Sequence, residues 1–342
     1  MRILALTPSF YPAVGGVETH VRRVSETLAE RGHDVTVLTH CDEPGQEQFG
    51  ALRVVRLRRS SALAAWLDAR PYLAAADVVH CHDAYSFFHF YLPSCWLPPR
   101  RPVFATFHGY ERYPIPAEAV RRRAFMRRRI INCLCMGDFI CQHYQTACYA
   151  VSYGGVDPVP DGGAPPGTPS AVFIGRLAED TSLMLYLEAL AVLKDEHDAR
   201  LHLTVVGEGP LRPMAEKYAE AQRLSVRFLG AVADPTPLLA ESSFAFVSGY
   251  LAIWQALAYR RLVFAVYDNE LKRDYLLGFP QAEEVLVIER GPTALAERLR
   301  ECLSNPGLAD ARVELGARLA VENTWDRVAD LYLDMYRAHG YE

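Results

Sequence analysis

Two adjacent glycines, Gly15 and Gly16, precede the first expected helix of the chain, and Glu18 follows them. Glycines at such a point let backbone N–H groups approach an anion closely, and the helix dipole favours negative charge there. The pair lacks the Gly-x-Gly-x-x-Gly spacing of a dinucleotide-binding loop. Since two glycines before a helix also make an ordinary turn, this loop is a candidate phosphate site that needs support from other motifs.

Two strand ends in the second half of the chain offer similar chemistry with a cation added. Gly175 and Arg176 follow one expected strand, and Gly207 and Glu208 follow the next. A guanidinium is always charged and presents its donors in a fixed planar fork, which suits the oxygens of a diphosphate. These residue types therefore indicate a diphosphate site.

His108 stands directly before Gly109, at the carboxyl end of another expected strand. A single histidine is more often structural than functional. Parallel sheets bind ligands outside the carboxyl ends of their strands, however, and this placement favours a functional role for His108.

Short apolar strands that alternate with helices must position these loops. In the first half, strands are expected at Arg2–Leu6, Asp34–Thr39, Val54–Leu57, Asp77–His80, Val103–Phe107, Cys133–Met136 and Tyr149–Ser152, and helices at Glu18–Arg31, Ala62–Ala75 and Ala117–Ile131. In the second half, strands are expected at Ala171–Ile174, Leu201–Val206, Val226–Leu229, Phe244–Val247, Leu262–Ala265 and Val285–Ile288, and closing helices at Leu308–Val321 and Trp325–Ala338. This alternation predicts an α/β fold with parallel, doubly wound sheets.

The densest run of proline and glycine, residues 158–169, separates the two halves. We expect a Rossmann-like domain over residues 1–157, a linker over 158–169 and a second Rossmann-like domain over 170–322. The last helix, within residues 323–342, is a candidate to cross back to the first domain. Ligands are expected in a cleft between the domains, at the carboxyl ends of both sheets.

The composition is that of a globular protein with a sizeable core, with 342 residues of which 50% are hydrophobic. The formal net charge of −5 argues against a general nucleic-acid binder. Residues 1–150 carry 18 Lys and Arg against 13 Asp and Glu, so this half leaves room for an anionic partner. No apolar run approaches the roughly 18–20 residues of a membrane-spanning helix, and the chain starts directly on a strand. We therefore expect a cytoplasmic protein.

Eight cysteines are too sparse for a disulfide scaffold. Four of them, Cys133, Cys135, Cys141 and Cys148, are close in sequence, with His143 among them. Their spacing differs from that of a zinc site, whose ligands come in pairs roughly two to four residues apart. We predict reduced thiols in the core, with a metal site as the weaker alternative.

Taken in order, the motifs resemble those of family 4 (group 1) retaining glycosyltransferases, which have the GT-B fold. The likeness runs nearly from end to end. It consists of Gly-Gly-Val-Glu at 15–18, His-Gly at 108–109, Gly-Val-Asp at 155–157, Gly-Arg-Leu at 175–177, Gly-x-Gly-Pro-Leu at 207–211 and Trp-Asp-Arg-Val at 325–328. The implied fold has two Rossmann-like parallel-sheet domains with an interdomain cleft.

The resemblance implies a nucleotide-diphosphate sugar as donor, bound mainly by the second half. The glycine pair at 15–16 would approach the donor, and His108 would lie beside its sugar. Arg176 would stabilise the departing diphosphate, on which charge grows in the transition state. Retention of configuration is implied, and neither a metal nor a cofactor is, because protein cations and helix N-termini supply the positive charge.

Two departures from the family pattern fall in the donor half. The lysine usual five residues after the arginine is Thr181 here, and the first of two usual glutamates has no counterpart. Gln255 matches the second glutamate and can still hydrogen-bond a ribose hydroxyl. Ser248 and Gly249 can offer backbone N–H groups to phosphate at a helix N-terminus.

Either this branch binds its donor with a rearranged set of residues, or it has lost activity. Lys272 and Arg273 are candidates for the missing cation. A solvated, charged helix start is the simpler explanation for both.

Six arginines lie between Arg121 and Arg129 on one expected helix, with apolar residues among them. Such a segment can contact an anionic membrane surface or a phosphate-bearing acceptor, and each basic residue near such a surface contributes about 1 kcal/mol. A solvated helix face is the alternative.

Together these expectations describe a metal-independent, retaining, hexosyl-type glycosyltransferase of a cell-envelope glycan or glycolipid pathway, at the inner face of the membrane. One alternative is a transferase that acts on a soluble natural-product acceptor. Another is a catalytically silent nucleotide-sugar-binding protein, which Thr181 favours and which the intact His108 and Arg176 oppose. A nucleotide-sugar epimerase shares the architecture, but its set of catalytic carboxylates is not evident.

Overall fold

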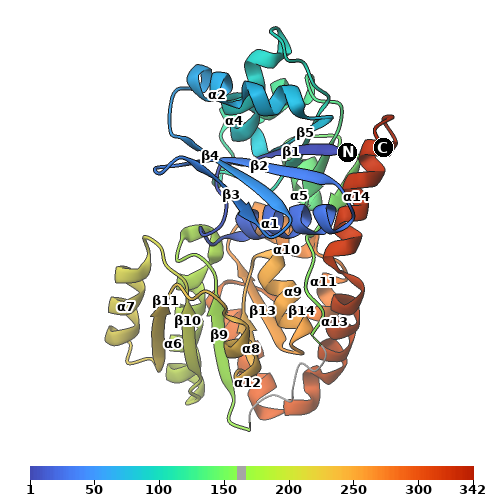
Figure 1. The fold of residues 1–342 in the computed structure, drawn as a ribbon. Helices are drawn as coiled ribbons and strands as arrows, with labels where there is room; N and C mark the ends of the chain where they lie inside the picture. Colours follow the sequence, from blue (N-terminus) through green and yellow to red (C-terminus); the bar gives the residue numbers. More distant parts are fainter. Residues whose placement is uncertain (160–166) are drawn as a thin grey trace. The chain divides into compact units, whose positions relative to one another are not determined.

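The computed structural model describes residues 1–159 and 167–342 (Figure 1). The chain divides into two compact units. Unit 1 comprises Met1–Gly154 and Trp325–Glu342, and unit 2 comprises Gly155–Thr324. Residues 160–166, the middle of the expected linker, lie outside the described residues. Unit 2 is therefore inserted in sequence between two segments of unit 1.

Unit 1 contains an eight-stranded sheet with the order β3-β4-β2-β1-β5-β6-β7-β8. Its strands are β1 (Arg2–Leu6), β2 (Asp34–Cys41), β3 (Gly45–Phe49), β4 (Leu52–Arg58), β5 (Val78–His82), β6 (Val103–Phe107), β7 (Cys133–Met136) and β8 (Ala150–Ser152). The central strands β5 and β6 are buried along their whole length, as expected for strands covered on both faces. The edge strand β3 pairs antiparallel with β4, whereas the other neighbours pair in parallel.

The helices of unit 1 are α1 (Gly16–Glu30), α2 (Ala62–Ala75), α3 (Asp83–Ser86), α4 (Ala117–Arg127), α5 (Asp138–His143) and α14 (Trp325–Arg337). The apolar positions Val21, Val24 and Leu28 of α1 face the core, and the chain turns after this helix at Gly32, whose φ is +88°. Helix α4 ends four residues before the expected Ile131, because the backbone turns at Arg128.

The last helix, α14, is strongly amphipathic and packs against α1 in unit 1. Its buried residues include Trp325, Tyr332 and Tyr336. At the edge of this contact, Arg31 forms ion pairs of 2.8 Å with Asp326 and 2.6 Å with Asp330. Helix α14 thus supplies part of the core of unit 1.

Unit 2 contains a six-stranded, all-parallel sheet with the order β11-β10-β9-β12-β13-β14. Its strands are β9 (Ser170–Ile174), β10 (His202–Val206), β11 (Val226–Gly230), β12 (Phe244–Phe246), β13 (Leu262–Tyr267) and β14 (Leu286–Arg290). Its helices are α6 (Leu183–His197), α7 (Arg212–Ala221), α8 (Thr236–Ala240), α9 (Tyr250–Ala258), α10 (Glu270–Leu277), α11 (Ala282–Val285), α12 (Gly291–Ser304) and α13 (Asp310–Glu322). The two sheets, parallel throughout except for the edge strand β3, confirm the predicted α/β class.

Within the described residues, no helix has both the length and the apolar character needed to cross a bilayer.

Candidate functional site

His108 follows β6 directly and lies half-buried at the carboxyl end of the unit 1 sheet. Its Nε2 atom is 2.9 Å from Nδ1 of His82, the last residue of the neighbouring strand β5. The next residue, Asp83, accepts a 2.9 Å hydrogen bond from the backbone N–H of His108. One strand end therefore fixes both the ring and the backbone of His108.

Four histidines of unit 1 form one group, the histidine cluster, made of His20, His80, His82 and His108. The ring of His20 packs edge-on against that of His108, with centroids 4.9 Å apart. Burial lowers the pKa of all four rings, and that of His108 falls to about 3 with the charge of Arg123 as a second cause. Each ring is therefore neutral at physiological pH and has one donor and one acceptor nitrogen.

Two tyrosines of α14 are within hydrogen-bond distance of this cluster. The hydroxyl of Tyr332 is 2.9 Å from Nε2 of His20 and 2.8 Å from the hydroxyl of Thr106. The hydroxyl of Tyr336 is 2.7 Å from Nδ1 of His80. The last helix of the chain thus contributes directly to the polar network behind His108.

The glycine pair lies at the N-terminus of α1, with Gly15 as the cap and Gly16 as the first helical residue. A Cβ atom at Gly15 would lie 2.3 Å from Oε2 of Glu18, whereas one at Gly16 would meet no atom within 4 Å. The Glu18 side chain therefore folds back over Gly15 and leaves the space beside Gly16 open. Helix α1 brings His20, four residues after Gly16, against His108.

Helix α4 carries part of the basic segment, but not all of its arginines are exposed. Arg123 is only 3% exposed and donates a hydrogen bond to the carbonyl of Gly109. Its guanidinium lies 3.6 Å from the ring centroid of Tyr144 and 3.5 Å from the carboxylate of Glu111. Arg123 therefore belongs neither to a membrane-contacting face nor to a solvated face of the Arg121–Arg129 segment, because it turns inward and braces the loop after His108.

In unit 2, two glycine loops pack directly on one another. Gly207 has a φ of +140°, and a Cβ there would lie 1.8 Å from the carbonyl oxygen of Gly175. A Cβ at Gly209 would lie 2.4 Å from the carbonyl oxygen of Leu177. The backbone N–H of Leu177 donates 2.9 Å to the carbonyl of Glu208. The loops after β9 and β10 thus require glycine at these positions for their close approach.

Arg176 is exposed, and its guanidinium pairs at 2.6 Å with Asp180, four residues later. Thr181, which occupies the usual lysine position, donates from its hydroxyl to the carbonyl oxygens of Arg176 at 2.6 Å and Ala178 at 2.7 Å. Thr181 therefore shapes the loop that carries Arg176 and adds no charge to it.

Lys272 of α10 lies beside this loop and is 5% exposed. Its ammonium donates to the backbone carbonyls of Asp180 at 2.9 Å and Ser248 at 3.1 Å. Burial lowers the pKa of Lys272 to about 8, and the charge of Arg176 lowers it further, while Asp180 and Asp268 oppose this. The neighbouring Arg273 pairs instead with carboxylates of its own helix.

Ser248 and Gly249 precede α9, and Gly249 caps it. The Ser248 hydroxyl donates 3.2 Å to the carbonyl of Thr181, which links this helix start to the Arg176 loop. A Cβ at Gly249 would meet no atom within 4 Å, whereas the next backbone N–H, that of Tyr250, donates 3.2 Å to the hydroxyl of Tyr275. Gln255 lies half-buried farther along α9. Glu208 is exposed and pairs with Arg212.

Sequence reasoning did not identify His20, His82 and Asp83 as neighbours of His108. The run from His80 to Asp83 carried a signal, because polar residues at the carboxyl end of a buried strand are typical of a site. The position of His20 has no such signal, since it depends on how α1 packs on the sheet.

The sequence matches two family models. The model described as Glycosyltransferase Family 4 matches residues 14–159, and the model described as Glycosyl transferases group 1 matches residues 168–305. An uncharacterized glycosyltransferase of Methanocaldococcus jannaschii is 23% identical over 280 residues, which cover 69% of this chain and 71% of that protein. One component of the human phosphatidylinositol N-acetylglucosaminyltransferase is 47% identical over 38 residues, 11% of this chain and only 8% of the relative.

Solved structures share the fold at low sequence identity. The Anabaena protein HepE in complex with UDP has a TM-score of 0.77 at 14% identity, with 99% of this chain and 100% of that chain covered. WaaG, a glycosyltransferase involved in lipopolysaccharide biosynthesis, has a TM-score of 0.70 at 18% identity, with 97% and 99% covered. With one family model on each half of the sequence and two parallel-sheet units of this architecture, the chain belongs to the family 4 (group 1) glycosyltransferases and has the GT-B fold.

Proposed function

We propose that the chain transfers a sugar from a nucleotide-diphosphate sugar whose diphosphate binds the loops after β9 and β12. The observation that carries this proposal is the grouping of two cations, Arg176 and Lys272, beside the N-terminus of α9. Cations and helix N-termini are the groups that stabilise an anion whose charge grows during reaction. The UDP in the HepE complex, a structure of the same fold, supports a uridine nucleotide as the first candidate.

In this proposal Lys272 replaces the cation that Thr181 does not provide. Arg176 exchanges its exposed contact with Asp180 for the diphosphate, since an exposed ion pair contributes little to stability. The loops after β9 and β10 pack beside this site and contain Gly175, Gly207 and Glu208. Ser248, Gly249 and Gln255 bind the donor from α9.

His108 acts on the sugar as a neutral hydrogen-bonding group, with Gly15, Gly16 and Glu18 at the start of α1 as further donor contacts. A ring with a pKa of about 3 is not a cation at neutral pH, so it can orient a hydroxyl but supplies no charge. We expect transfer with retention and without a metal ion.

Thermal denaturation with UDP, GDP, ADP and their sugars, in the presence of a chelator, tests donor binding. A ligand at 100 times its dissociation constant stabilises by about 2.7 kcal/mol, and we expect this for one nucleoside diphosphate. The matched variants are Arg176→Ala and Arg298→Ala, both of exposed arginines in unit 2. Equal stabilisation of the two variants, or a shift only with added divalent metal, would contradict the proposed site.

The anomeric configuration of the product, followed by NMR as it forms, tests retention. A product of the opposite configuration to the donor would exclude a retaining mechanism. Nucleotide-sugar binding without any transfer or hydrolysis would instead support the silent-protein alternative.

For the acceptor, we propose a cell-envelope glycan or glycolipid at an anionic membrane. Exposed residues of unit 1 support this. Trp96 is 55% and Leu97 51% exposed, and the guanidinium of Arg129 lies 5.6 Å from the Trp96 ring centroid. Arg121, Arg122 and Arg128 of the same basic segment are also exposed. Apolar residues with neighbouring arginines are typical of membrane-surface contact.

Sedimentation with vesicles of neutral or partly anionic lipid tests this surface. We expect binding only to the anionic vesicles, with a decrease in high salt and in the double variant Arg121→Glu/Arg122→Glu. Transfer to a soluble natural-product acceptor, without vesicle binding, would favour the alternative.

A further inference from the structure

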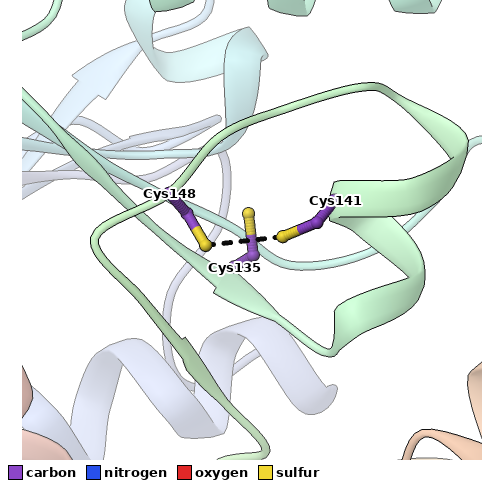
Figure 2. Close-up of side chains that lie close together, drawn as sticks. All are labelled: Cys135, Cys141 and Cys148. Carbon is purple, nitrogen blue, oxygen red and sulfur yellow. Dashed lines mark hydrogen bonds between the residues drawn. The ribbon is translucent and has the colours of Figure 1, made fainter.

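Three thiols of unit 1 converge although they are separated in sequence. Cys135 lies in β7, Cys141 lies in α5, and Cys148 precedes β8. Their sulfur atoms all lie within 4.8 Å of one another, and those of Cys141 and Cys148 are 3.4 Å apart. Figure 2 shows Cys141 and Cys148 directed toward one another.

The connection from β7 to β8 creates this convergence. Gly137, with a φ of +100°, turns the chain sharply out of β7 and into α5. The backbone N–H of Thr146 then donates 3.2 Å to the carbonyl of Cys141, and that of Tyr149 donates 2.7 Å to the carbonyl of Cys133. The return segment is thereby fixed against the strand, so the thiols are held together by backbone hydrogen bonds.

The three thiols offer the soft sulfur ligands that a thiophilic cation such as Zn²⁺ prefers. A cysteine binds a metal as its thiolate, so a cation that binds the trio releases thiol protons.

We propose that Cys135, Cys141 and Cys148 form a site for one thiophilic divalent cation of the zinc class. Zn–S bonds of about 2.3 Å in tetrahedral geometry place sulfur atoms about 3.8 Å apart. This value lies between the 3.4 Å of the Cys141–Cys148 pair and the 4.8 Å within which all three sulfur atoms fall. Cys135 is fully buried, whereas Cys141 and Cys148 are half-buried and give the ion access from solvent. Solvent fills the fourth position. The site is independent of the proposed donor site.

Titration of the reduced, full-length protein with Co²⁺ and then Zn²⁺ tests the proposal. We expect thiolate charge-transfer bands, tetrahedral visible bands, one ion per chain and release of protons, with Zn²⁺ displacing Co²⁺. Cys141→Ser and Cys148→Ser should each weaken binding by more than the roughly 10–100-fold typical of outer-shell losses. Cys95→Ser, which removes another half-buried thiol of unit 1, should leave binding unchanged.

Absence of the bands in the reduced protein would overturn the proposal. So would equal binding by the Cys148→Ser and Cys95→Ser variants. A Cys141–Cys148 disulfide in the purified protein that, once reduced, leaves no metal binding would show that the pair is a redox site instead. Cys141 and Cys148 are half-buried, so their substitution could also disturb the fold. An unchanged circular dichroism spectrum of each variant shows that weaker binding comes from the lost ligand.

Discussion

The polar groups at the strand ends of the two units differ in charge. In unit 2, the exposed Arg176 and the buried Lys272 place two cations in one loop group. In unit 1, the histidine cluster is neutral, and the nearby cation Arg123 is occupied by the carbonyl of Gly109. This difference is what we expect if unit 2 binds the charged part of a donor and unit 1 binds hydroxyl groups.

The two units also differ in how strongly substitution of a loop glycine should lower the free energy of unfolding. Gly207→Ala in unit 2 should reduce the free energy of unfolding by about 4 kcal/mol or more, because its Cβ would overlap the carbonyl of Gly175. Gly16→Ala in unit 1 should change it by less than about 1 kcal/mol, since its Cβ meets nothing within 4 Å. Urea denaturation measures the free energy of unfolding of both variants. Similar losses in the two would contradict the predicted difference.

Acid should destabilise the protein through the histidine cluster. Its rings have lowered pKa values when folded, so the unfolded chain binds more protons below about pH 6.5. The contribution of the neutral rings to stability is complete above that pH. It is lost as the pH falls through the lowered pKa values of the folded rings, about 3 for His108, by at most about 1.4 kcal/mol per pH unit for each ring. Denaturation between pH 7.5 and 5 tests this. His82→Gln should flatten the dependence, and an unchanged slope would contradict the assignment.

Removal of the exposed cation should affect turnover but not folding. Arg176→Ala should lower kcat by about 100–1,000-fold, as loss of one preorganised transition-state donor does in other enzymes. Arg298→Ala is the control. His108→Ala should lower kcat less while leaving nucleotide binding intact. Loss of nucleotide affinity in the His108 variant would show that unit 1 also binds the charged group.

The smallest expected effect is a pH dependence of nucleotide affinity. Lys272 loses its charge as the pH rises through about 8, so affinity for the diphosphate should fall by up to about tenfold per pH unit above that value. Calorimetric titration between pH 7 and 9.5 measures the slope. Lys272→Met should bind more weakly at pH 7 and show no such slope. A slope that persists in this variant would assign it to another group.

Apolar strands were predictable because burial on both faces leaves a continuous hydrophobic run. Val103–Phe107 and Cys133–Met136 match their expected bounds for this reason. Strand β3 was missed because its residues are mostly polar and exposed, and its pairing with β4 is what makes it a strand.

The positions of His108 and Arg176 were predictable, because each stands beside a glycine just after a predicted strand and the structure places both there. Their roles remain predictions. It was not predictable where the neighbours come from distant segments. His20 and Tyr332 meet although they lie 312 positions apart in the sequence. The inward turn of Arg123 also escaped prediction, because a helix rich in arginine gives no sequence signal of which one is buried.

The division of unit 1 into two segments has a consequence for biosynthesis. Residues 1–154 leave the ribosome long before Trp325–Glu342, with all of unit 2 between them. Until α14 emerges, the surfaces of α1 and β5 that Tyr332 and Tyr336 cover are exposed to solvent. A nascent or prematurely terminated chain therefore presents these uncovered surfaces to chaperones and proteases. A polypeptide extended through α14 covers them, so unit 1 is completed only after all of unit 2 has been synthesised.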